Sequence, residues 1–254
     1  MATETVDRSR NMEEKSWWDL WNTSYRSADA QDENSAGLFA HVVKLMRDIA
    51  PGRILEIACG TGTVSRSLEF TSYHGLDISA AAIKIAQQKG QDFKFPAQSA
   101  KASYEAADFH DWALPAEGFD TVLCVDAISC FRNQALVIQK MAQALRTNGL
   151  LLLTTVNPIV YRRIRRVGGV KLENGPVSHW LPRRELHSLV LQAGLVIERS
   201  YTILPRGNMG FLRIVNSHRL NRMLGPGFAA CLRALKEQIG LGQYRVLIAR
   251  KLTD

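Results

Sequence analysis

The amino-acid sequence predicts an α/β fold in which helices cover both faces of a mostly parallel sheet. Short apolar runs alternate with segments whose apolar residues recur at helical spacing. Pro-Gly, Gly-Thr-Gly and Asn-Gly sequences separate these segments. Repeated strand-helix units of this length are typical of a parallel sheet covered on both sides. With 254 residues, 46% of them apolar, the chain can bury a large core without a metal ion or a disulfide.

The expected elements follow one another in a regular order. Strands are predicted at residues 53–58, 73–76, 119–125, 150–156, 195–201 and 244–249. Helices are predicted at residues 38–49, at 80–90 with Ser79 as N-cap, at 137–145 and at 186–193. The polar residues 29–34 are expected to form a loop. Residues 157–180, and about 40 residues from Pro205 onward, interrupt the alternation and are interpreted as insertions.

Basic charge is concentrated in the last two fifths of the chain. Residues 1–154 hold 15 basic and 19 acidic residues, whereas residues 155–254 hold 17 and 5. This asymmetry favours an anionic partner: an acidic small molecule, a phosphate backbone, an acidic carrier protein or a membrane surface. The four cysteines form no CxxC pair, and no apolar run approaches the roughly 20 residues of a membrane helix. We therefore expect a cytoplasmic protein with reduced thiols.

The segment from Ile54 to Thr63 is the one that indicates chemistry. It runs from a buried strand through a glycine-rich turn, and ligands of doubly wound sheets bind at the carboxyl ends of the strands. Gly60 and Gly62 let the backbone approach a bound group. The carboxylate of Asp77, at the end of the next strand, is suited to accept hydrogen bonds from ribose hydroxyls. A nicotinamide cofactor is disfavoured, because the third glycine of its fingerprint is absent and Glu56 would repel a pyrophosphate.

These residues resemble the first motif of the class I S-adenosylmethionine-dependent methyltransferases that act on small molecules. Four further segments match that family in order: 75–79, 107–109, 119–125 and 145–150. The resemblance implies a Rossmann-like, doubly wound, mostly parallel seven-stranded sheet that ends in an antiparallel hairpin. It also implies S-adenosyl-L-methionine as cofactor and a single domain over residues 1–254. Within it we expect a helical N-terminal lid at 1–34, a cofactor-binding core at 52–156, and cap or substrate insertions at 157–182 and 205–242.

The resemblance also implies where the cofactor binds. It assigns Glu56, Gly60 and Gly62 to the methionine part, Asp77 to the ribose, Asp108 and Phe109 to the adenine, and Val125 to the sulfonium side. Ala58, Thr61 and Ile78 complete the expected cofactor-binding set. Ala58 stands where the family most often has glycine. Since alanine adds only a methyl group, we expect binding to survive this departure.

Aromatic residues are concentrated near the start of the chain, at Trp17, Trp18, Trp21 and Tyr25. In similar methyltransferases an N-terminal helix covers the cofactor, and an aromatic face can contact a sulfonium. Tyr25 and Arg26 are therefore candidate cofactor-binding residues. The same residues, spaced four apart, are equally typical of plain helix packing.

Residues 161–166 form the strongest cluster of basic charge and follow the fifth predicted strand. Arginines at this place can bind a carboxylate or a phosphate in a fork. A solvated amphipathic helix explains the same pattern, and a helix on a membrane surface is a lesser alternative. The candidate substrate residues are Phe131, Tyr161, Arg162 and Trp180.

His110 and His179 are candidate general bases, although the sequence favours an ordinary structural or surface histidine at each position. Methyl transfer from a sulfonium often needs little beyond alignment, so a dedicated base can be absent. The six histidines show no metal-ligand spacing, and no metal is predicted.

The predicted function is transfer of a methyl group from S-adenosylmethionine to an oxygen or nitrogen of a small, acidic molecule by direct in-line displacement. An RNA-modifying enzyme that uses the basic half as a phosphate track is one alternative, disfavoured because no additional nucleic-acid-binding module is recognisable. A cofactor-binding subunit without catalysis is the other, since a fold does not determine a function.

Overall fold

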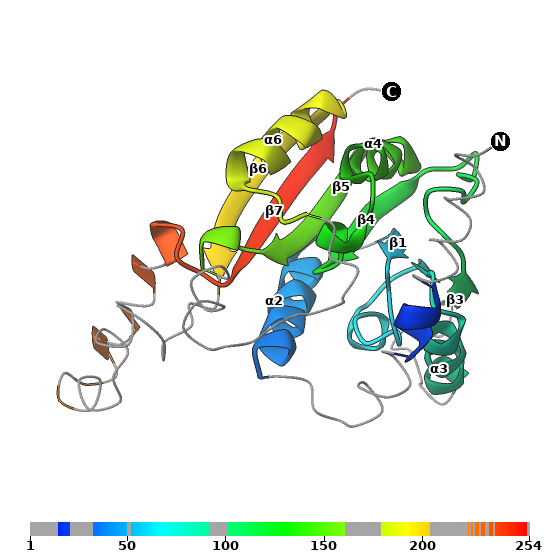
Figure 1. Cartoon of the computed structure of the whole chain (residues 1–254), viewed down its shortest axis with the longest axis horizontal. Coiled ribbons are helices and arrows are strands. Elements are labelled where there is room, and N and C mark those ends of the chain that lie inside the picture. Colours follow the sequence, from blue (N-terminus) through cyan, green and yellow to red (C-terminus); the bar gives the residue numbers. More distant parts are fainter. Residues whose placement is uncertain are drawn as a thin grey trace.

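One seven-stranded sheet forms the centre of the molecule, with strands in the order β3-β2-β1-β4-β5-β7-β6 (Figure 1). The computed structural model describes residues 15–20, 33–49, 52–91, 101–160, 179–203 and 237–252, with scattered residues between 223 and 235. The strands are β1 (Arg53–Ile57), β2 (Ser72–Asp77), β3 (Lys101–Ala106), β4 (Phe119–Val125), β5 (Leu145–Val156), β6 (Leu195–Ile203) and β7 (Tyr244–Lys251). Only β7 runs antiparallel to its neighbours, β5 and β6. The predicted Rossmann-like, mostly parallel sheet is thus confirmed.

Helices cover both faces of this sheet. The structure has α2 (Glu33–Ile49), α3 (Ala80–Gln91), α4 (Gln134–Ala144) and α6 (Arg183–Gln192), with 3-10 turns η1 (Ser65–Ser67) and η2 (Ile128–Cys130). α2 buries Leu38, Val42 and Met46 against one face. α4 and α6 pack against the opposite face, where Leu186 of α6 is fully buried. None of the described helices is long and apolar enough to cross a membrane.

β5 shows why its apolar run reads as a strand. Side chains of a strand alternate between faces, so Leu150 and Leu152 join the core beneath α2, whereas Leu151 and Leu153 join the core beneath α4 and α6. All four are buried. A strand buried on both sides has a continuous apolar sequence rather than an alternating one.

Several element boundaries differ from those expected from the sequence. α2 begins at Glu33, inside the segment predicted as a loop, and β5 begins at Leu145. β3 was not predicted, because its side chains are largely exposed and carry no apolar signal. The predicted N-cap of α3 is confirmed, since Ser79 Oγ accepts the N–H of Ala82 at 3.1 Å. The division of the chain into lid, core and insertions stays a prediction.

Candidate functional site

The turn after β1 lies at the carboxyl edge of the sheet and contains three residues with positive φ. These are Ala58 (57°), Gly60 (55°) and Gly62 (69°). The N–H of Cys59 donates to the carbonyl of Leu76 in β2 at 2.9 Å, which ties the turn to the neighbouring strand. The backbone therefore reverses direction within a few residues and remains close to the end of β2.

Asp77 connects this turn to the next two elements. Its Oδ2 accepts the N–H of Gly60 at 2.8 Å, and its Oδ1 accepts the N–H of Ser79 at 2.9 Å. Its carbonyl accepts the N–H of Ala107 at 2.9 Å, just beyond β3. The structure thus brings together Gly60 and Asp77, two residues that the sequence assigns to one site.

Glu56 lies below the turn and is only 2% exposed. Its carboxylate accepts a short hydrogen bond from the hydroxyl of Tyr73. Burial and the adjacent charge of Glu56 raise the pKa of Tyr73 well above its usual value, so the tyrosine stays a hydrogen-bond donor. Glu56, two residues before the turn, is therefore held in place by Tyr73 of the second strand, Ser72–Asp77.

Tyr104 of β3 supports the turn from the side. A Cβ atom at Gly62, Gly75 or Gly90 would lie only 3.0 to 3.1 Å from its ring, so the three glycines make room for this one side chain. The Tyr104 hydroxyl is 2.7 Å from Ser65 Oγ, which donates to the carbonyl of Gly62 at 2.9 Å. This chain of contacts determines the position of the Gly62 backbone, and sequence analysis missed Tyr104 because β3 itself was missed.

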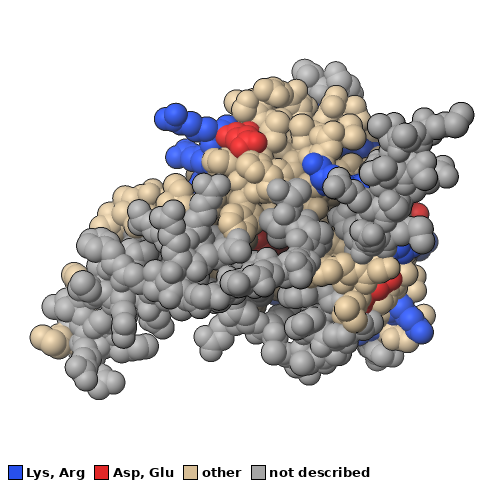
Figure 2. Space-filling model, viewed as in Figure 1, with Lys and Arg blue, Asp and Glu red and all other residues tan. Residues whose placement is uncertain are grey.

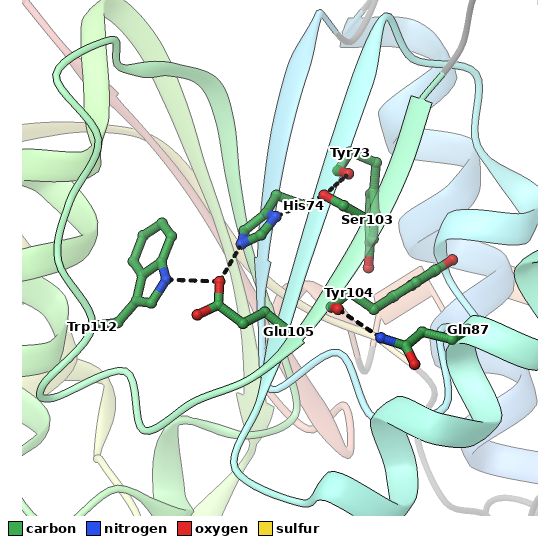
Figure 3. A network of polar contacts seen from close by, with 7 residues as sticks. All are labelled: Tyr73, His74, Gln87, Ser103, Tyr104, Glu105 and Trp112. Carbon is green, nitrogen blue, oxygen red and sulfur yellow. Dashed lines mark hydrogen bonds and ion pairs between the residues drawn. The ribbon is translucent and has the colours of Figure 1, made fainter.

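A network on the opposite side of β2 and β3 holds the segment that follows β3 (Figure 3). His74 Nε2 lies 3.2 Å from Glu105 Oε2, and the indole N–H of Trp112 donates to the same oxygen at 3.2 Å. His74 and Trp112 also stack, with ring centroids 5.5 Å apart. Trp112 thereby anchors the turn that begins at Asp108, whose carbonyl accepts the Trp112 N–H at 3.0 Å.

Asp108 and His110 form a close pair within that turn. Asp108 Oδ1 lies 2.9 Å from His110 Nδ1 and 2.9 Å from the His110 backbone nitrogen. Burial alone would raise the pKa of Asp108, but the two hydrogen bonds, with the charges of His110 and Arg132, lower it to about 2. The adjacent Phe109 ring lies in the core beneath Lys140, whose Nζ is 5.3 Å from the ring centroid.

The carboxyl end of β4 contributes a residue that sequence analysis did not single out. Asp126 has a φ of 55°, and its N–H lies 3.1 Å from the carbonyl and 3.0 Å from Oγ1 of Thr154. It follows the predicted site residue Val125, which is buried. The sequence feature that could have identified Asp126 is its place as an acidic residue directly after an apolar strand. Phe131, a predicted substrate residue, lies with its ring centroid 5.7 Å from that of His110.

The segment before α6 lies against η2, beyond the end of β4. The His179 carbonyl accepts a hydrogen bond from Gln134 Nε2 at 2.7 Å, and the imidazole Nε2 lies 3.0 Å from Glu185 Oε2. Half of the His179 side chain is exposed. Trp180 follows it and is half-buried. The structure therefore places His179 and Trp180 beside η2, beyond the carboxyl end of β4.

The N-terminal segment also contacts this edge where the structure describes it. Asp19 Oδ1 accepts the Ser79 hydroxyl at 2.6 Å and the Ala81 N–H at 3.1 Å, at the amino end of α3. Ser79 is two residues from Asp77. Four predicted site residues, Tyr25, Arg26, Tyr161 and Arg162, lie outside the described residues.

The side chains at this edge fit the cofactor that the resemblance implies. Asp77 and Asp108, both half-buried, offer carboxylate oxygens beyond β2 and β3. S-adenosylmethionine offers matching donors, since it carries ribose hydroxyls and an amino group. Its positive sulfonium and ammonium groups are compatible with the buried Glu56, whereas a pyrophosphate is not. Asp77, Asp108 and the Gly60–Gly62 backbone are thus the residues suited to hold it.

Comparison with known proteins gives a consistent result. A family model described as a methyltransferase domain matches residues 32–200. A phthiotriol/phenolphthiotriol dimycocerosates methyltransferase of Mycobacterium ulcerans is 32% identical over 119 residues, which are 44% of this chain and 40% of that protein. The malonyl-[acyl-carrier protein] O-methyltransferase of Legionella pneumophila is 28% identical over 166 residues, 63% of this chain and 55% of that protein. The chain thus spans about half the length of the curated relatives it matches.

A solved structure shares the fold. The N-methyltransferase NodS of Bradyrhizobium japonicum, determined with S-adenosyl-L-homocysteine, superimposes with a TM-score of 0.58 over 88% of this chain and 90% of that chain. The two sequences are 14% identical, so this likeness concerns the arrangement of helices and strands alone.

Proposed function

Because the chain belongs to the methyltransferase-domain family, we propose that it transfers the methyl group of S-adenosylmethionine to an oxygen or nitrogen of a small, acidic molecule. The observation that carries this proposal is the contact of Gly60 N–H with Asp77 Oδ2. It places a carboxylate at the glycine turn, where a ligand with ribose hydroxyls needs one.

Three observations support an acidic acceptor. Residues 155–254 carry 17 basic and only 5 acidic residues, and they include α6, β6 and β7. Exposed Arg183 and Arg184 stand at the start of α6, and basic atoms protrude beside this helix in Figure 2. The Legionella relative is named for a malonyl group, which bears a free carboxylate. A positive potential at such a site attracts anions.

The chain's own residues have three tasks in the proposed reaction. When bound, S-adenosylmethionine supplies a methyl group on a positively charged sulfur. The Gly60–Gly62 backbone and Asp77 orient that group, and Glu56 below them provides negative charge. The segments after β4 and before α6, which hold Phe131 and Trp180, border the space where an acceptor would lie in line with the methyl group. Alignment of this kind supplies much of the rate of a group transfer.

We further propose His110 as the base for a hydroxyl or amine acceptor. Nδ1 of His110 faces the ionised Asp108, which only accepts hydrogen bonds, so Nε2 is the ring nitrogen that would take a proton from an acceptor. Nε2 forms no hydrogen bond within the described part of the chain. His110→Gln is expected to lower kcat about 100-fold and to leave S-adenosylhomocysteine affinity unchanged. An unchanged kcat would show that no base acts, as holds for a carboxylate acceptor.

Calorimetric titration of S-adenosylhomocysteine tests the cofactor site. Asp77→Ala is expected to weaken binding by about 10- to 100-fold, because hydrogen bonds to a charged group are lost. Glu117→Ala is the matched control, since Glu117 is an exposed carboxylate at the amino end of β4, on the opposite edge of the sheet. It should bind as the wild type does.

The outcomes separate the alternatives. A folded wild type that does not bind the cofactor would refute the proposal. Binding without methyl transfer to any small carboxylic acid would indicate a cofactor-binding subunit without catalysis. Transfer to RNA, with an affinity that falls steeply as salt is raised, would indicate a nucleic-acid substrate.

A further inference from the structure

Arg245, the second residue of β7, is buried in an unusual way. It is 5% exposed, yet its Nε forms no hydrogen bond within the described part of the chain. No described acidic side chain forms an ion pair with it. Arginine is rarely buried without a partner, because removing a guanidinium from water is costly unless an anion compensates. Among the described residues, the side chain therefore has no anionic partner of the kind that normally accompanies a buried guanidinium.

Two neighbouring buried polar atoms also have no hydrogen-bond partner among the described residues. Thr155 of β5 lies directly opposite Arg245 in the antiparallel pair, so both side chains point to the face that α6 covers. Thr155 is 1% exposed, and its Oγ1 has no partner among the described residues. The same holds for the amide oxygen of Gln243, two residues before Arg245. By contrast, Thr202 on the other side of Arg245 is satisfied, since its Oγ1 donates to the Glu237 carbonyl at 2.9 Å.

The surrounding charge is positive. Burial, and then the charge of Arg183, lower the pKa of Arg245. The pKa of His187 on α6 is also lowered, first by burial and then by Arg183 and Arg245. His187 Nε2 is 2.8 Å from Ser200 Oγ, so this side chain is already engaged. A ligand that enters here meets a guanidinium, a free hydroxyl and a positive potential, which together favour an anion.

An anion bound by Arg245 and Thr155 would lie at the same edge of the sheet as the candidate site. Thr155 is one residue from the carboxyl end of β5, and Arg245 is one residue from the amino end of antiparallel β7. Both therefore lie toward the edge that carries Asp77 and Asp126. Figure 1 shows the beginning of β7 and the amino end of α6 at this same edge.

We propose that Arg245, with the hydroxyl of Thr155, binds a carboxylate of the methyl acceptor; this rests on the proposed function and names the residues that select its acidic substrate. The free Nε matches a carboxylate in a side-on fork, in which Nε–H and one terminal N–H donate in parallel. A single buried guanidinium balances the one charge of a carboxylate, and a second carboxylate of the same molecule can stay in water. A phosphate dianion concentrates two charges on one group and would need a second buried cation, whereas Arg183 is exposed.

Thermal unfolding with malonate as the probe tests this site. In the presence of saturating S-adenosylhomocysteine, and at ionic strength matched with sodium chloride, malonate at ten times its Kd should raise the Tm of the wild type by about 3–5 °C. Arg245→Met should abolish this rise. Without malonate the Tm of Arg245→Met should equal or exceed that of the wild type, because an apolar side chain replaces an uncompensated buried charge.

Arg250→Met is the matched control. Arg250 lies on the same strand but is partly exposed and paired with Glu198, so its loss should leave the malonate effect unchanged. Inorganic phosphate is a second probe, and a larger Tm rise with phosphate than with malonate would overturn the assignment to a carboxylate. An equal malonate effect in wild type and Arg245→Met would overturn the proposal. So would failure of both Arg245→Met and Arg245→Gln to fold, since the guanidinium would then serve the fold.

The cofactor measurement keeps this test separate from the proposed function. If wild type and Arg245→Met bind S-adenosylhomocysteine equally, a missing malonate effect refutes only the carboxylate site. If neither protein binds it, the methyltransferase proposal itself fails.

Discussion

Ala58 occupies a position where the methyltransferase family most often has glycine, and its backbone conformation is strained. The residue has a φ of 57°, in the left-handed region that glycine adopts without cost. The sequence suggested that the extra methyl group would be tolerated, and the structure shows that its cost lies in the backbone. The left-handed conformation costs an L-residue roughly 1–2 kcal/mol of folding free energy. Part of this cost is offset because glycine would lose more conformational entropy on folding than alanine does.

Ala58→Gly is therefore expected to raise the free energy of unfolding by about 0.5–1 kcal/mol. Urea denaturation at neutral pH measures this change. Ala135→Gly is a suitable comparison, because Ala135 is exposed in α4, where glycine should destabilise by a similar amount. A loss of stability on Ala58→Gly would show that the methyl group contributes packing that outweighs the strain.

At the scale of elements, α3 connects the cofactor edge with the N-terminal segment. Ser79 caps the helix through the N–H of Ala82, and its hydroxyl donates to Asp19. The negative charge of Asp19 is favourable at a helix amino end. A helical segment at residues 15–20 is thus attached two residues from Asp77, which suits the expected role of the N-terminus as a lid.

Asp19→Ala should loosen this attachment. We expect trypsin to cleave after Lys15 several-fold faster, and added S-adenosylhomocysteine to protect the variant less than the wild type, since a local opening is governed by local contacts. Asp48→Ala is the matched control, because Asp48 is an exposed acid near the end of α2. Equal cleavage rates of wild type and Asp19→Ala would show that Asp19 does not hold the N-terminal segment against α3.

At the scale of the whole molecule, the sequence predicts what is encoded locally. β1, β4 and β5 are apolar runs buried on both faces, and the turn with Gly60 carries its own backbone signal. β3 is an exposed edge strand, so its residues follow no apolar pattern, and Tyr104 was missed with it. Arg245 and Thr155 are 90 residues apart in the chain. They are neighbours because β5 and β7 pair in antiparallel register, and no local sequence pattern predicts this pairing.

The same pairing has a consequence for biosynthesis. Within the described sheet β6 lies at an edge and pairs with β7, although β7 leaves the ribosome later than β6 does. The parallel strands β1 to β5 and the glycine turn are translated earlier and can assemble first, because domains form progressively as the chain emerges. β6 must wait, unpaired, until residues 244–251 insert beside β5. The nascent chain can thus assemble the glycine turn before residues 244–251 emerge, so the proposed anion site at Arg245 forms after the proposed cofactor site.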